Sequence, residues 1–219
     1  MSRHYSPHIV TDGLVLYLDA ANQKSFVSDN TIWYDISKNN NDGMLSGTTF
    51  TQDKGGGFIF NGNTDWINLG NDTSLQIGGY NISLCAWFKT SASQYQPILD
   101  DLGALDYTSW GMWLTPTGKV AWFGWDESAI AVNTGNITNV VTVMEGGIVK
   151  FYINSIKDIN QYSKSAIIST TDNKTIGARS DGTGYFFNGT IYNCSIYNRA
   201  LTAQEVKQNF DALKSRFGL

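Results

Sequence analysis

Short apolar runs recur along the chain from Gly13 to Tyr197, and clusters of Gly, Asn, Asp and Ser separate them. This rhythm is typical of antiparallel β proteins, in which turn residues at regular spacing end one strand and begin the next. Several runs are apolar at odd and even positions alike, as expected for strands that meet an opposite sheet on one side and loops or a partner on the other. The clearest runs are 14–18, 58–60, 82–88, 148–153 and 191–197. The pattern therefore predicts an all-β fold, a two-sheet antiparallel β-sandwich.

The segments between these runs carry the residues that tight turns require. Residues 55–57 are three glycines, and residues 115–118 place Pro and Gly where a hairpin needs them. Because no composition break or internal repeat interrupts residues 13–201, we assign them to a single sandwich domain. Residues 1–12 are polar and extended by Pro7, so they predict an N-terminal arm that adds little to the core.

Residues 202–219 predict a C-terminal α-helix. Thr202 and Glu205 have the spacing of a capping box, in which each side chain satisfies an otherwise unpaired backbone N–H group. Apolar residues follow at helical spacing, and a glycine stands where the helix should end. The apolar residues are Val206, Phe210, Leu213 and Phe217. We expect this helix to pack on the sandwich or on a neighbouring molecule.

Composition and charge narrow the class of protein. The chain has 219 residues, of which 42% are hydrophobic and 16% charged, which excludes disorder and predicts no insertion into a membrane. A net charge of −4 without a Lys/Arg cluster argues against nucleic acid as a partner. The N-terminus lacks the apolar run of a secretory signal peptide, so we expect the protein to be made in a cytoplasm and not to be exported by the secretory route.

Cysteine and histidine are scarce. Cys85 and Cys194 lie within apolar strands, which favours two buried reduced thiols over a bridge between adjacent strands. His4 and His8 both precede the predicted sandwich, so together with two cysteines they do not form a zinc site of ordinary spacing.

Three stretches together resemble a known family: residues 12–22 followed by 33–37 and 41–43, residues 58–67 followed by 82–88, and residues 189–191 running into 196–206. In order and spacing they are similar to the laminin-G-like jelly-roll domains of the concanavalin A-like lectin/glucanase superfamily, over nearly the whole chain. This resemblance implies a concanavalin A-like jelly roll. The sequence departs from the family pattern at 139–143, which lacks the usual Trp or His, and at Ser155, where the turn usually carries Gly.

The amino-acid sequences of the two ends of the chain resemble those of versions of this domain found in structural proteins of tailed bacteriophages. It implies a non-enzymatic component of a virion surface, assembled in the host cytoplasm, in a head decoration, neck, tail or fibre. Capsid, neck or tail proteins would then be its partners, and a homo-oligomer is one arrangement that such a role allows. The alternative is a lectin-like adhesin that recognises carbohydrate on the host cell surface.

The superfamily also includes glucanases, so a glycosidase is the third hypothesis for the function. Glycoside hydrolysis requires two carboxylates roughly 5–9 Å apart. The three glutamates are Glu127, Glu145 and Glu205, of which Glu205 belongs to the helix cap and Glu145 to a Gly-Gly turn. Asp126 directly precedes Glu127, and neighbouring residues of a strand point to opposite faces. We therefore expect no catalytic pair and no enzyme.

An aromatic hairpin at 110–125 supplies the candidate binding face. A two-residue loop would pair Trp113 with Val120 and Gly111 with Trp122, which directs Trp113, Val120 and Trp122 away from the core. Exposed aromatic side chains are typical of a glycan platform or a protein interface. Two alternatives stay open: loops such as 91–107 cover this face, or a one-residue bulge at Gly118 exchanges the faces.

Calcium is the cofactor that the resemblance suggests, because rim loops of jelly-roll lectins often hold it. Two loops offer suitable oxygen ligands without the fixed spacing of a dedicated calcium loop. Turn formation through side-chain hydrogen bonds is the competing explanation for such residues. The candidates are Asn61, Asn63 and Asp65 on one loop and Asp100, Asp101 and Asp106 on the other.

Overall fold

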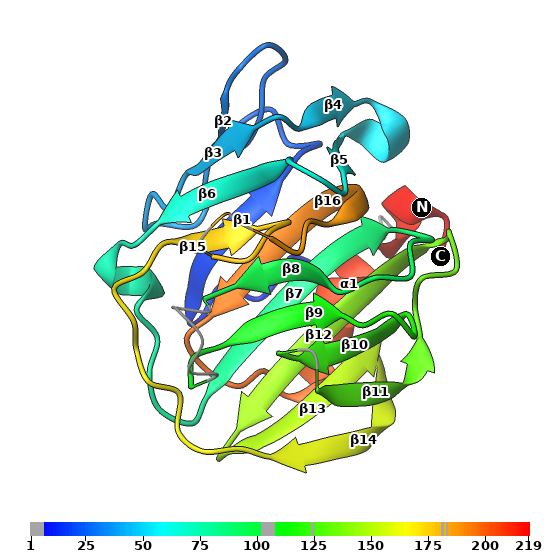
Figure 1. Ribbon diagram of the computed structural model, residues 1–219. Coiled ribbons are helices and arrows are strands. Elements are labelled where there is room, and N and C mark those ends of the chain that lie inside the picture. The colour runs from blue at the N-terminus through cyan, green and yellow to red at the C-terminus, as the bar shows by residue number, and fades with distance from the viewer. Residues whose placement is uncertain (1–6, 102–107, 124, 181, 183) are drawn as a thin grey trace, which may run out of the picture.

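The computed structural model describes residues 7–101, 108–123, 125–180, 182 and 184–219. Two antiparallel sheets of eight strands each face one another, which confirms the predicted β-sandwich (Figure 1). One short α-helix follows the last strand. No helix within these described ranges is long and apolar enough to cross a membrane.

Sheet A runs in the order β14-β13-β12-β7-β16-β5-β4, and β1 also pairs with β16. Its central strands are the longest and most apolar of the chain, which explains why the sequence pattern identifies them most clearly. The strands are β1 (Leu14–Asp19), β4 (Thr49–Thr51), β5 (Gly57–Asn61), β7 (Ile82–Lys89), β12 (Ile137–Glu145), β13 (Ile148–Ile153), β14 (Ile156–Ser163) and β16 (Asn188–Tyr197).

Sheet B runs in the order β11-β10-β9-β8-β15-β6-β3-β2. Two short 3-10 helices, η1 (Asp53–Gly55) and η2 (Thr73–Leu75), lie in loops between strands. The strands are β2 (Ile32–Trp33), β3 (Gly43–Ser46), β6 (Trp66–Gly70), β8 (Gln96–Asp100), β9 (Gly111–Leu114), β10 (Lys119–Trp122), β11 (Asp126–Ala131) and β15 (Lys174–Ile176).

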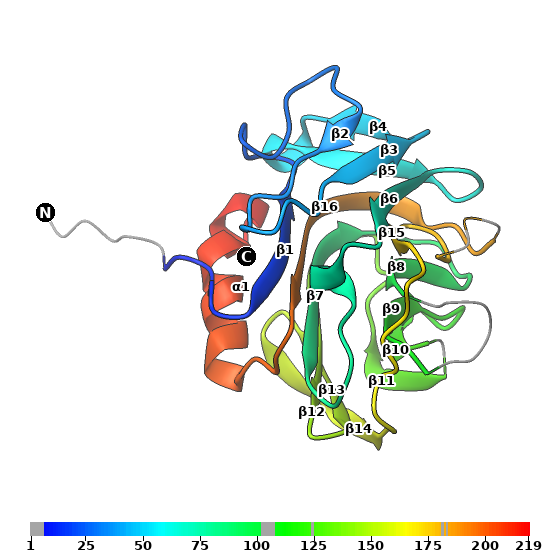
Figure 2. The same ribbon diagram turned by 90° about the vertical axis from the view of Figure 1, so that its left-hand side faces the viewer.

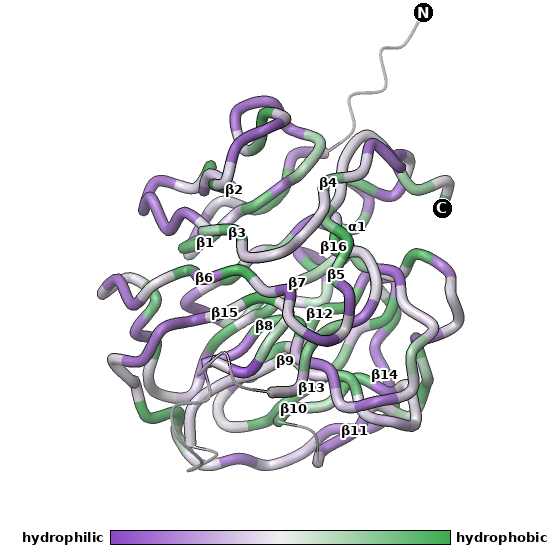
Figure 3. The backbone as a smooth tube through the Cα atoms, turned by 45° about the horizontal axis from the view of Figure 1, so that its top comes forward, coloured by the Kyte–Doolittle hydropathy of each residue, from purple (hydrophilic) through white to green (hydrophobic). Residues whose placement is uncertain are grey.

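The main core fills the space between the two sheets. Leu16, Phe58 and Phe88 from sheet A meet Ile98 and Met112 from sheet B, and all five are buried. Hydrophobic segments follow the strands, while hydrophilic segments collect in the connecting loops (Figure 3). Burial of apolar area between the layers therefore supplies the main driving force for this architecture.

The C-terminal helix α1 (Ala203–Phe217) covers the outer face of sheet A, on the side away from sheet B (Figure 2). The predicted capping box is present between Thr202 and Glu205, and Gly218 ends the helix in the left-handed conformation. The ring of Trp87 on β7 stacks against Phe217 at 4.3 Å between ring centroids. Of the two partners predicted for this helix, the structure shows the sandwich.

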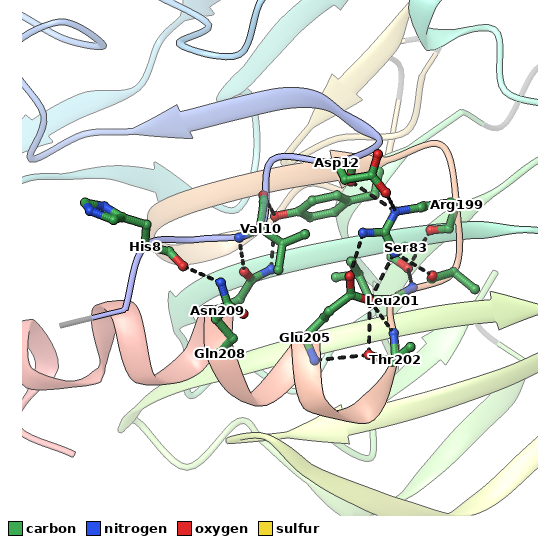
Figure 4. Close-up of polar contacts among 12 residues, drawn as sticks. His8, Val10, Asp12, Ser83, Arg199, Leu201, Thr202, Glu205, Gln208 and Asn209 are labelled. Carbon is green, nitrogen blue, oxygen red and sulfur yellow. Dashed lines mark hydrogen bonds and ion pairs between the residues drawn. The ribbon is translucent and has the colours of Figure 1, made fainter. Parts of the chain in front are cut away.

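The segment before β1 is held against this helix. Asn209 accepts a hydrogen bond from the backbone N of Val10 at 2.8 Å, and the Tyr197 hydroxyl donates to the Val10 carbonyl at 2.9 Å (Figure 4). Arg199 forms an ion pair with Asp12 at 2.7 Å. Val10 is buried in the cluster beneath the helix, so this residue of the predicted arm packs on the sandwich. Residues 1–6 of the predicted arm, with His4, lie outside the described residues.

The two cysteines are free and buried. Ser195 on β16 lies opposite Cys85 on β7, so Cys194 is one residue out of step with Cys85 and points to the other face of sheet A. Burial raises the pKa of Cys85 to about 12 and also raises the pKa of Cys194. The favoured prediction of two reduced thiols is confirmed, and the register explains why a bridge does not form.

Candidate functional site

The aromatic hairpin has a different register from the one that the sequence suggested. Trp122 lies opposite Met112, and Val120 lies opposite Leu114. The Thr115 N–H donates to the Lys119 carbonyl, so the loop has three residues instead of two, and Gly118 is left-handed with φ of 74°. One additional loop residue exchanges the two faces of the second strand.

This register corrects the prediction of an exposed aromatic face. Val120 and Trp122 point into the space between the sheets and are buried. Trp113, on the neighbouring strand β9, is opposite Ala121 and next to Met112, which faces the core, so it lies on the outer face of sheet B. It too is buried, which means that none of these three side chains offers a free platform.

The buried side chain of Trp113 takes part in a set of hydrogen bonds on the outer face of sheet B. Its indole Nε1 donates to Oδ1 of Asp100 at 2.7 Å. The other carboxylate oxygen, Oδ2, accepts from the backbone N of Ser180 at 2.9 Å. The buried Asp100 therefore joins strand β9 to the loop between β15 and β16. A hydrogen bond to a buried charged group is among the stronger ones in proteins.

Two tyrosines form the open aromatic surface of this face. The ring of Tyr185 lies 5.5 Å from that of Trp113, and Tyr95 meets Tyr185 edge to face at 6.0 Å between ring centroids. Tyr95 is 37% exposed and Tyr185 is 50% exposed. The guanidinium of Arg179 lies 5.8 Å from the Tyr185 ring centroid. We call Tyr95, Tyr185 and Arg179 the tyrosine surface.

The backbone around Tyr185 is constrained. Tyr185 has φ of 53°, a left-handed conformation that is uncommon for a bulky residue and persists only where the surroundings hold it. Gln94, beside Tyr95, donates a side-chain hydrogen bond to the carbonyl of Phe186 at 3.0 Å. This bond and the bond from Ser180 to Asp100 connect the chain at Phe186 and at Ser180 to the outer face of sheet B.

Sequence reasoning did not find Tyr95 and Tyr185. They are 90 positions apart, and nothing in the local pattern indicates that their rings meet. A signal was present in the sequence Gly182-Thr183-Gly184-Tyr185, a glycine-rich loop that carries an aromatic residue. Such loops, supported by a rigid scaffold, are where binding residues concentrate in β-sandwich proteins.

Asp101, the residue that follows Asp100, belongs to a buried ion pair. Lys174 Nζ is 2.8 Å from Oδ1 of Asp101, and both side chains are 0% exposed. Thr170 and Ser109 donate their hydroxyl groups to the same carboxylate. Burial raises the pKa of the Asp101 carboxyl, and the ammonium and the two hydroxyl groups counteract this increase. The two aspartates therefore bind different segments. Asp100 binds the loop that carries Tyr185, and Asp101 binds the segments at 109 and 170.

The predicted calcium ligands already have partners within the protein. Oδ1 of Asn61 accepts from the backbone N of Asn63 and of Thr64, and Asp65 accepts from the backbone N of Asn61. These bonds build a turn, the competing explanation given above. Across the described parts of the chain no three His, Cys, Asp or Glu residues gather in a metal-binding arrangement. With the Lys174 ammonium at Asp101, these residues do not fit a calcium ion. The candidate Asp106 lies outside the described residues.

The glutamates are dispersed. Glu127 lies 3.6 Å from Lys119, Glu145 pairs with Lys150, and Glu205 pairs with Arg199. Arg199 and the hydrogen bonds of the helix cap lower the pKa of Glu205 to about 2. A general acid in glycoside hydrolysis needs the opposite shift, an increase in its pKa.

A family model for the concanavalin A-like lectin/glucanases superfamily matches residues 61–207. The chain belongs to this superfamily. A search of curated proteins finds no match.

Solved structures agree with this superfamily assignment at the level of the fold. Domain 4 of a GH43 extracellular arabinanase from Geobacillus stearothermophilus, in complex with arabinotriose, has 18% sequence identity and a TM-score of 0.66, over 91% of this chain and 99% of that one. Trypanosoma rangeli sialidase in complex with sialic acid has 15% identity and a TM-score of 0.71, over 97% of this chain and 36% of that one.

The binding domain of Paraclostridial Mosquitocidal Protein 1 has 16% identity and a TM-score of 0.64, over 90% of this chain and 52% of that one. The chain therefore spans about half the length of this protein and about a third of the sialidase. At these identities the likeness concerns the fold alone.

Proposed function

We propose that this chain is a non-catalytic carbohydrate-binding domain, and that a glycan binds at the tyrosine surface. The observation that carries this proposal is the pair of partly exposed tyrosine rings, which meet edge to face beside the buried Trp113.

The chemistry of the surface suits a sugar. A pyranose ring has an apolar C–H face that packs on an aromatic ring, and hydroxyl groups that need hydrogen-bond partners at its edge. Tyr185 and Tyr95 offer rings for the first and phenol hydroxyl groups for the second. The guanidinium of Arg179 lies beside the same Tyr185 ring. The arabinanase domain bound to arabinotriose supports this proposal as a fold relative.

The absence of catalysis is part of the proposal. Glu127, Glu145 and Glu205 lie on different elements and each has a basic partner, which supports a binding role over hydrolysis. A reducing-sugar release assay on arabinan and on mixed glycans checks this part. Sustained release of sugar by the purified chain would overturn it.

Isothermal titration calorimetry with arabinotriose, preceded by a glycan array, tests the binding site. Tyr185→Ala should weaken binding by at least about tenfold, since an aromatic contact of this kind contributes on the order of 1 kcal/mol and the remaining contacts lose their alignment. Tyr80→Ala is the matched control, because Tyr80 is 52% exposed and lies outside the tyrosine surface. Equal affinities of the two variants for every array ligand would refute the assignment of the site.

We further propose that the domain is displayed on the surface of a bacteriophage particle. The support is the resemblance of both ends of the sequence to domains of tailed-phage structural proteins. If the proposal holds, mass spectrometry of purified particles finds the chain at a fixed stoichiometry to the major capsid or tail protein. Recovery of the chain only as free protein that binds host-cell glycan would favour the adhesin instead.

A further inference from the structure

A cleft opens at another part of the sandwich, away from the tyrosine surface. It has a volume of about 620 Å³ and lies between the segment that follows β1 and the region of β4 and η1. Small-molecule sites typically have volumes of roughly 300–1,000 Å³. None of the residues that line it belongs to the tyrosine surface, so the two sites are built from different elements.

The floor of this cleft is aromatic. The rings of Phe26 and Phe50 are 4.8 Å apart at 37°, and Phe26 rests edge to face on Phe58 of the main core at 4.8 Å. Val27 lies beside them and is 58% exposed. The floor is therefore an apolar surface that packs on the main core and is open to solvent at Val27.

The rim of the cleft carries uncharged polar groups. Gln23, Ser28 and Gln52 line it, and all three are exposed. Within the described part of the chain the side-chain amides of Gln23 and Gln52 make no hydrogen bond, and no charged residue lines the cleft. Each amide offers a carbonyl acceptor and two N–H donors.

We infer that this cleft is a second carbohydrate site, which takes an uncharged sugar. A ligand that matches it must have an apolar face for Phe50 and Val27 and hydroxyl groups for Gln23, Ser28 and Gln52. A neutral pyranose has both. An anionic ligand would lack a cationic partner among the lining residues, and a metal ion would lack a carboxylate.

The inference does not depend on the tyrosine surface, because the two sites share no residue and each can be mutated without changing the other. A titration followed by NMR, with maltotriose, cellotriose and lactose as neutral probes and trigalacturonate as the anionic one, identifies the residues that respond. We expect at least one neutral probe, at millimolar concentration, to shift the Val27 methyl signals.

Two variants sharpen the test. The double variant Gln23→Ala/Gln52→Ala removes only exposed amides, so it should fold normally and bind about tenfold more weakly, since two neutral hydrogen bonds together contribute this order of affinity. Ser28→Trp should fill the cleft and abolish the shifts. Gln161→Ala, an exposed glutamine on β14, is the control and should leave binding unchanged.

The outcomes separate the two sites. No shift at Val27 with any neutral probe, or unchanged affinity in the double variant, would overturn the second site. Shifts at Val27 that persist in Tyr185→Ala support it whatever becomes of the tyrosine surface. A shift with trigalacturonate alone would contradict the assignment to an uncharged sugar.

Discussion

Replacement of Lys174 by methionine should strongly destabilise the fold. Lys174 Nζ lies 2.8 Å from Asp101, and it also donates to the carbonyl groups of Thr170 and Asp172. With an effective dielectric constant of about 20, the attraction across this distance is about 6 kcal/mol, most of which offsets the cost of burying the two charges. Lys174→Met removes the attraction and leaves the Asp101 carboxylate buried. We expect the free energy of unfolding to fall by roughly 3–5 kcal/mol at pH 7.

The effect should depend on pH in a defined direction. Burial holds the pKa of Asp101 above its ordinary value, and loss of the ammonium removes a group that lowers it. A carboxyl whose pKa is raised in the folded state adds stability below its unfolded pKa, and this contribution is lost as the pH rises through the folded value. The variant should therefore lose less stability, relative to wild type, at pH 5 than at pH 7.

Urea denaturation followed by tryptophan fluorescence at the two pH values measures this difference. Lys157→Met is the control, because Lys157 is exposed and its ammonium donates a hydrogen bond to the side chain of the exposed Gln161. It should change the stability by less than about 0.5 kcal/mol. A loss below about 1 kcal/mol in Lys174→Met at pH 7, or a loss of equal size at both pH values, would refute the reasoning about a buried charge.

Three further outcomes follow from the same contacts. Trp122→Ala should cost roughly 3–5 kcal/mol in thermal denaturation, because its ring is in the core; a change typical of an exposed residue would contradict the hairpin register. Asn209→Ala should cost about 1–3 kcal/mol and speed amide hydrogen exchange at Val10, whose N–H loses its acceptor; unchanged exchange would show that this segment is held otherwise. Cys85 and Cys194 should resist a thiol reagent at pH 8 until denaturant is added, because burial raises both pKa values, and rapid labelling of the native protein would count against their burial.

Local patterns in the sequence were sufficient for the fold class and for the helix. Alternating and fully apolar runs depend on the two-residue repeat of a strand, and a capping box depends on residues three positions apart. Both are properties of a short segment. The sandwich, the helix that begins after Thr202 and the left-handed Gly218 could therefore be predicted. The separation of the three glutamates could also be predicted, because the residues next to each one in the sequence place it in a different local element.

Only the tertiary structure decided which side chains form the surface. One additional residue in the loop before Lys119 moved Trp122 from the outer face to the core, because the side chains of a strand alternate and a shift of one position inverts them all. The meeting of Tyr95 with Tyr185 results from loops that are distant in the sequence and that Asp100 and Gln94 bring into register. The sequence by itself determined a β-sandwich with a capped helix, since these follow from short-range periodicity. The candidate binding surfaces depend on long-range contacts, and the fold alone specifies those.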